Sequence, residues 1–137
     1  MQEDVLIKKY FYNLNYIVLC EMYLNEYLKP DAIEEKDLKK YNPGHLGTSL
    51  SLNFIQANLN YFLNKNKLTS KTVIGTGHAG VSLISNLWLN GILKDYYPKY
   101  SLDKNGLNNL IKDFGETIRS EINPEYPQTI YDGGELG

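Results

Sequence analysis

The sequence has little of several features that mark particular classes of protein. A single cysteine, Cys20, excludes an internal disulfide, and its apolar helical surroundings predict a buried, reduced thiol typical of the cytoplasm. The formal net charge of -2 argues against a broad basic surface for nucleic acid or for an anionic membrane. Residues 1–4 lack the features of a secretory signal, and no apolar run approaches a membrane span. We expect a cytoplasmic protein that binds neither nucleic acid nor membrane.

Metal-ligand patterns are also missing. No cluster of histidine, cysteine or carboxylate side chains has metal-ligand spacing, so we expect no metal site in the chain. The hydrophobic fraction of 42% in 137 residues suits one compact core and leaves little room for another. We therefore expect one domain over residues 1–137.

Helical periodicity dominates the first half of the chain. Apolar and aromatic residues over positions 5–28 predict one long helix or two, ended by Pro30. Residues 30–43 are polar, with proline at both ends, and indicate a loop with a short helical turn. A further helix is expected over about residues 50–63, with one apolar face buried: Leu52, Ile55, Leu59 and Phe62.

A short strand is expected in the second half. Residues 71–74 include a β-branched run that ends at Gly75 and predicts a buried parallel strand. A helix should follow from about residue 78 to Gly91, and another after a cap at Ser101 or Asp103. This order is an α/β pattern, mostly helical, with one strand and therefore an incomplete sheet.

Both histidines of the chain lie in glycine-rich turns before apolar helices. Residues 75–80 read Gly-Thr-Gly-His-Ala-Gly, and backbone amides at such a helix start suit a diphosphate. His78 could donate a hydrogen bond to phosphate or move a proton, or it could simply cap the helix. His45, in residues 44–48, likewise allows two interpretations: a residue of a functional site or a solvated loop residue. A third glycine-rich segment, residues 131–137, ends the sequence.

These three segments together resemble the amino-terminal part of the phosphoketolases. Residues 44–48 and the helix after them are similar to the family's Gly-His-Trp-Gly-Thr turn and helix. Residues 75–80 are similar to its Gly-Pro-Gly-His-Gly-Gly turn, and residues 133–137 reproduce its Gly-Gly-Glu-Leu-Gly segment. The resemblance covers the chain from about residue 10, with the motifs in order at compatible spacing.

The resemblance implies a fold and a reaction. It implies the amino-terminal portion of a transketolase-like fold that binds thiamine diphosphate with Mg²⁺, whose metal ligands would lie outside this chain. Phosphoketolases cleave xylulose 5-phosphate or fructose 6-phosphate with phosphate, giving acetyl phosphate and an aldose phosphate. By position, His45 and His78 would be catalytic. Cofactor contacts are implied for Thr48, His78, Gly134, Glu135 and Leu136.

Some positions depart from the family pattern, and several interpretations stay open. Ser120 and Glu121 stand where the family has a Ser-His pair, Tyr131 matches another family histidine, and Leu46 replaces the aromatic of the first turn. The chain alone is expected to be inactive. It is interpreted as a fragment or first subunit of a phosphoketolase-type or split transketolase-type enzyme, completed by a complementary chain or a homo-oligomer. The alternative is a non-catalytic remnant or binding module.

Overall fold

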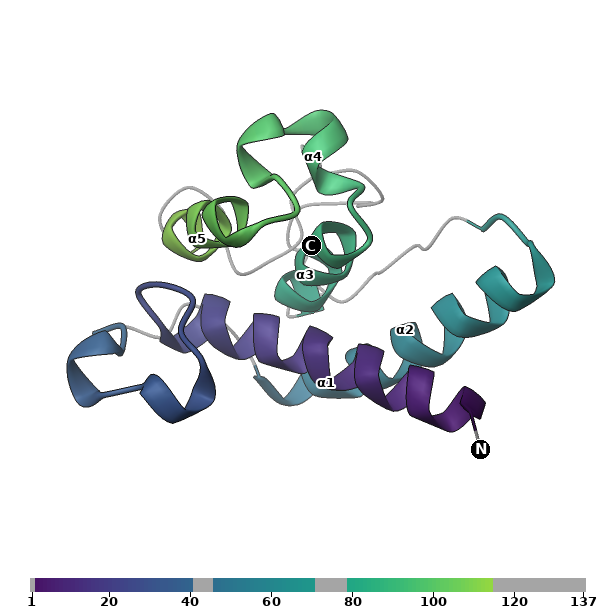
Figure 1. Cartoon of the computed structure of the whole chain (residues 1–137), viewed down its shortest axis with the longest axis horizontal. Helices are drawn as coiled ribbons and strands as arrows, with labels where there is room; N and C mark the ends of the chain where they lie inside the picture. Colours follow the sequence, from purple (N-terminus) through teal and green to yellow (C-terminus); the bar gives the residue numbers. More distant parts are fainter. Residues whose placement is uncertain (1, 41–45, 71–78, 115–137) are drawn as a thin grey trace, which may run out of the picture.

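A computed structural model describes residues 2–40, 46–70 and 79–114 of the chain, and Figure 1 shows their arrangement. Throughout these residues the regular elements are helical, and an antiparallel bridge pairs Leu24 with Leu38. Short 3-10 turns cover Pro30–Ala32, Glu35–Asp37 and Pro98–Tyr100. The α-helices are α1 (Gln2–Tyr23), α2 (Leu46–Asn66), α3 (Gly80–Leu89), α4 (Leu93–Tyr96) and α5 (Lys104–Asp113).

The helices form two layers. Helices α1 and α2 pack against each other, and α3 contacts both of them. Figure 1 shows α3, α4 and α5 on one side of the α1–α2 pair, with α5 above the carboxyl end of α1. The opposite side of the α1–α2 pair carries no further helix among the described residues.

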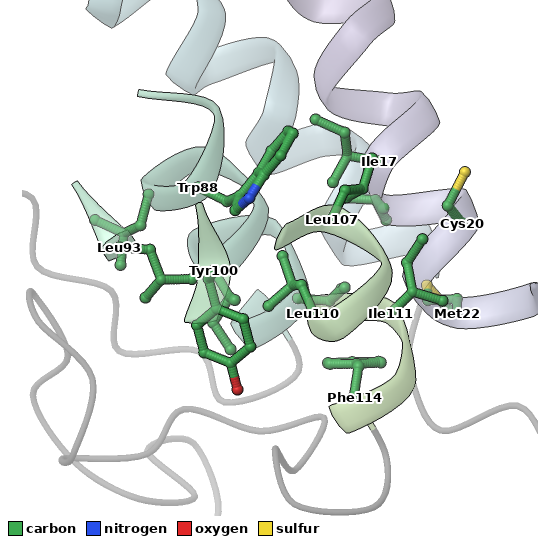
Figure 2. Close-up of a cluster of buried hydrophobic side chains, with 14 of the residues drawn as sticks. Ile17, Cys20, Met22, Trp88, Leu93, Tyr100, Leu107, Leu110, Ile111 and Phe114 are labelled. Carbon is green, nitrogen blue, oxygen red and sulfur yellow. The ribbon is translucent and has the colours of Figure 1, made fainter. Parts of the chain in front are cut away.

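The hydrophobic core lies between the two layers, and α3 is at its centre. Every residue of α3 from Gly80 to Trp88 is buried, which agrees with a helix that is apolar on most of its faces. Figure 2 shows side chains of α1, α3 and α5 gathered in this core. Cys20 is among them, so the predicted burial of the thiol is confirmed, and burial raises its pKa to about 12.

Local sequence signals set the ends of α3 and α5. Gly91 follows the last turn of α3 with φ of 72°, a left-handed conformation that favours glycine, and its amide donates to the Trp88 carbonyl. The Asp103 carboxylate caps α5 by accepting a hydrogen bond from the Gly106 amide at 2.9 Å, so of the two predicted caps, Ser101 and Asp103, the helix uses Asp103. Gly106 itself lies against the backbone of Ser101.

Two helix boundaries differ from the expected ones. Helix α1 ends at Tyr23 and not near residue 28, because the chain turns into the bridge with Leu38 and the Tyr23 carbonyl accepts from the Lys39 amide. Helix α2 begins at Leu46, earlier than expected. The expected strand at residues 72–74 lies outside the described residues, so the strand and the α/β assignment remain predictions.

The buried face of α2 was predicted wrongly. Ile55 and Phe62 are 58% and 54% exposed, and Leu52 and Leu59 are only half-buried. The residues that α2 buries are instead small or polar, namely Ser49, Asn53, Gln56 and Ala57. Periodicity identified an apolar stripe on α2 correctly. It could not show that polar residues of the same helix form hydrogen bonds with α1 and α3 and are buried instead.

Candidate functional site

The two histidine-bearing turns precede the two helices that meet in the core. Helix α2 begins at Leu46, directly after His45, and α3 begins at Gly80, just after His78 and Ala79. His45 and His78 themselves lie outside the described residues. Leu46 packs against the hydrophobic core and Ala79 is buried inside it. The chain next to each histidine is therefore anchored to the same core.

A buried hydrogen-bond network joins α2 to α3 and α1 close to the start of α3. The Gln56 amide donates to the Ser82 hydroxyl at 2.7 Å, and that hydroxyl donates to Oδ1 of Asn53. The Asn53 amide in turn donates to Oδ1 of Asn15 on α1 at 2.7 Å. Because Asn53, Gln56 and Ser82 are buried, loss of one of them leaves another polar group unpaired away from water. The network fixes how α3 sits on α2.

A second network lies further along the same helices. The Tyr10 hydroxyl donates to Oδ1 of Asn86 at 2.6 Å, and the amide of Asn60 donates to both Tyr10 and Asn86 at 2.9 Å. Asn90 also donates to the Tyr10 oxygen, at 2.8 Å. Burial raises the pKa of Tyr10 to about 12, so its hydroxyl keeps its proton and remains a donor at neutral pH. The α1–α2–α3 contact is thus hydrogen-bonded at two levels.

A buried carboxyl group stands beside these networks. The Ser85 hydroxyl of α3 donates to Oε1 of Glu21 at 2.9 Å, whereas no described group donates to Oε2. Burial raises the pKa of Glu21 to about 8, partly opposed by the hydrogen bond from Ser85 and the charge of Lys39. The group is therefore mostly protonated at neutral pH.

Lys39 links the carboxyl ends of α1 and α5. Its ammonium donates to the backbone oxygens of Glu21 at 2.6 Å, Ile111 at 2.7 Å and Phe114 at 3.2 Å. A cation there also complements the negative ends of both helix dipoles. This contact holds residue 39, shortly before the His45 turn, against the core.

Few of the sequence-predicted site residues fall within the described chain. Thr48 lies exposed in the first turn of α2, and the cofactor contact implied for it stays a prediction. Gly134, Glu135 and Leu136 lie outside the described residues. Over residues 2–40, 46–70 and 79–114, no three His, Cys, Asp or Glu side chains are placed to hold a metal ion. In the same ranges, no helix is long and apolar enough to cross a membrane.

Sequence reasoning missed the polar groups that organise this region. Asn53, Gln56 and Asn60 recur at helical spacing, and this second stripe was a usable signal. Ser82 and Ser85 interrupt an otherwise apolar helix, which also indicates buried polar contacts. The sequence gives no indication that Glu21 is buried, because glutamate side chains are usually exposed even next to apolar residues.

The comparisons with known proteins identify the family of the chain. Residues 2–137 match the family described as the XFP N-terminal domain. Probable phosphoketolase 2 of Lactiplantibacillus plantarum is 37% identical over 134 residues, which are 96% of this chain and 17% of that protein. The xylulose-5-phosphate phosphoketolase of Lactiplantibacillus pentosus has the same identity and coverage. Probable phosphoketolase of Schizosaccharomyces pombe is 40% identical over 107 residues, 77% of this chain and 13% of that protein.

The match is to one end of much longer proteins. The chain spans about one sixth of the length of these curated relatives, at 13% to 17%. Nearly all residues of the chain nevertheless match the family described as the XFP N-terminal domain. The chain therefore belongs to the phosphoketolase family, in which it corresponds to the amino-terminal domain.

Proposed function

We propose that the chain forms the amino-terminal section of a phosphoketolase-type enzyme. The enzyme would cleave xylulose 5-phosphate or fructose 6-phosphate with inorganic phosphate, giving acetyl phosphate and a shortened aldose phosphate. The observation that carries the proposal is the match of residues 2–137 to the amino-terminal domain of this family. The chain's own contribution would be the two histidine turns, held on one core by α2 and α3.

Each histidine has a proposed role. His45 and His78 would hydrogen-bond sugar hydroxyls and move protons at the reacting carbons, since imidazole titrates near neutral pH. Leu46 and Ala79 would keep the two turns at a constant separation because both pack on the core. The networks around Ser82 and Asn86 would preserve that separation as substrate enters and product leaves.

Thiamine diphosphate with Mg²⁺ is the proposed cofactor, and it would supply the electron sink for carbon–carbon cleavage. Thr48 would contact it from the first turn of α2, with His78 and the terminal residues Gly134, Glu135 and Leu136 on other sides. The metal ligands would come from the part of the enzyme outside this chain. The sugar phosphate and that complementary part, supplied by a separate chain or a homo-oligomer, are the proposed partners, and the cytoplasm is the proposed location.

Reconstitution tests the proposal. The chain would be mixed with the Lactiplantibacillus pentosus phosphoketolase from which the matched amino-terminal segment has been deleted, together with thiamine diphosphate and Mg²⁺. Acetyl phosphate formed from xylulose 5-phosphate and phosphate would be measured as its hydroxamate. We expect product only when both polypeptides are present, and less of it with His78→Ala. Binding of the two polypeptides without any product would favour the non-catalytic remnant or binding module instead.

A further inference from the structure

Helix α2 carries two stripes of opposite character. The inner stripe is polar, and its members Asn53, Gln56 and Asn60 bond to α1 and α3. The outer stripe is apolar and recurs at i, i+3, i+7 and i+10; it consists of Leu52, Ile55, Leu59 and Phe62, of which Leu52 lies at the inner edge and also packs against the hydrophobic core. Soluble helices ordinarily have the reverse arrangement, with the apolar stripe inward. Within the described residues no element covers Ile55 and Phe62 of this stripe, so the packing of these helices does not account for their apolar character.

The composition of α2 indicates that the outer stripe is a contact surface. Among the 21 residues of α2 the charged side chain is Lys65, in the last turn, and no acidic residue occurs. Its outward positions carry Ile55 and Phe62, more than half exposed, and small polar residues such as Ser51. Depletion of charge together with exposed aromatic and aliphatic side chains distinguishes the centre of a protein interface from ordinary surface.

The position of the outer stripe links it to the candidate site. Thr48 lies one helical turn before Leu52, so it continues the stripe toward the amino end of α2. His45 precedes Thr48 by three residues. A polypeptide seated on the outer stripe would thus reach the residue that the proposed function places against the cofactor.

We infer that the outer stripe of α2 is the surface that binds the rest of the phosphoketolase polypeptide, the part outside the amino-terminal segment that this chain matches. This inference rests on the proposed function. It is supported by the lengths involved, since the chain covers 17% of its relatives and more than four fifths of their sequence lies outside it. That remainder is large enough to cover the stripe and extend past Thr48.

A second copy of this chain suits the outer stripe less well. From Leu52 to Phe62 the stripe is only about 15 Å long at 1.5 Å per residue. Stable protein interfaces bury at least roughly 1,200 Å² in total, which one self-paired stripe of four side chains does not approach. A larger partner can add surface around the stripe beyond what its four side chains supply.

Titration of the complementary polypeptide tests the inference. The probe is the truncated Lactiplantibacillus pentosus phosphoketolase, titrated against the full chain labelled with a fluorophore. The variant Ile55→Glu/Phe62→Glu places two charges on the outer stripe, and we expect affinity to fall at least tenfold. Tyr96→Glu/Leu102→Glu is the matched control, because both side chains are similarly exposed but belong to α4 and the segment before α5. Its affinity should remain within twofold of wild type.

Crosslinking keeps the inference testable if the double variant is poorly folded. A benzophenone amino acid at position 55 should crosslink the complementary polypeptide on irradiation, and one at position 96 should not. Crosslinks between two copies of the chain, or equal yields from both positions, would overturn the inference. Product formation with unchanged affinity of the Ile55→Glu/Phe62→Glu variant would overturn it too, while leaving the proposed function intact. Absence of both binding and product would refute the proposed function and, with it, the inference.

Discussion

The Ser85 hydroxyl lies 2.9 Å from Oε1 of Glu21 and donates to it, joining α3 to α1 through a carboxyl group that is fully buried. The other carboxyl oxygen has no partner among the described residues. A charge at this position is therefore poorly compensated, and the fold favours the protonated acid. The stability of the fold should consequently depend on the ionisation of Glu21.

Glu21→Gln should change that dependence. Burial raises the pKa of Glu21 from 4.5 to about 8, so the folded state binds the proton more tightly than the unfolded state. The resulting stabilisation is complete below about pH 4.5 and is lost as the pH rises through 8. The neutral amide avoids this loss, and we expect Glu21→Gln to be more stable at pH 7 to 9, by on the order of 3 kcal/mol. Urea unfolding from pH 5 to 9 measures the difference. Equal slopes for both proteins would contradict it.

Lys39→Met should destabilise the fold. The substitution keeps an aliphatic stem but removes the ammonium that donates to the carbonyls of Glu21, Ile111 and Phe114. Unpaired buried carbonyls cost about 1 to 3 kcal/mol each when no water replaces the donor, so we expect a loss of at least about 2 kcal/mol. Lys36→Met is the control, because Lys36 pairs with Glu34 at an exposed surface and should matter little. Thermal unfolding of the two variants compares them.

Ser82→Ala and Asn53→Ala should be coupled. Both residues belong to the network between α2 and α3, and each removal leaves part of the other unpaired. We expect each single variant to lose about 1 to 3 kcal/mol and the double variant to lose clearly less than the sum. Ser51→Ala removes a hydroxyl from the exposed side of α2 and should be nearly neutral. Additive losses would show that the network does not act as a unit.

Two glycine substitutions should have opposite results. A Cβ atom on Gly106 would lie 1.9 Å from the carbonyl oxygen of Ser101, so Gly106→Ala must displace backbone and should destabilise strongly. A Cβ on Gly47 meets nothing within 4 Å, and Gly47 lies inside α2. Gly47→Ala should therefore stabilise the protein by up to about 1 kcal/mol through helix propensity. Melting temperatures should move in opposite directions, and a parallel shift would refute the local explanation.

Periodicity and capping rules predicted much of the helical framework. The positions of α1, α3 and α5 and the Asp103 cap follow from apolar spacing and from a side chain suited to a helix start. The order of the glycine-rich motifs was enough to identify the family, which the comparisons confirm. These features depend on residues close together in the sequence.

The inward face of α2 could not be predicted in the same way. Whether Asn53 or Ile55 faces the core depends on partners such as Asn15 and Ser82, which are distant in sequence. The burial of Glu21 likewise requires Ser85 and the backbone contact of Lys39. For the histidine turns, sequence gives the neighbouring helices and the family, while the roles of His45 and His78 remain predictions.

The bridge between Leu24 and Leu38 brings both ends of the intervening segment together at the carboxyl end of α1. Lys39, the next residue, donates hydrogen bonds to the backbone oxygens of Glu21 and Ile111 and so holds the chain against α1 and α5. The segment between the two bridge residues is therefore a loop whose two ends are held together by the bridge. Insertions or cleavage near its exposed residue Glu34 should leave the approach to the His45 turn in register. Variation is therefore expected around Glu34, whereas Tyr27 and Leu28 are tied to Asn108 of α5 and Tyr16 of α1.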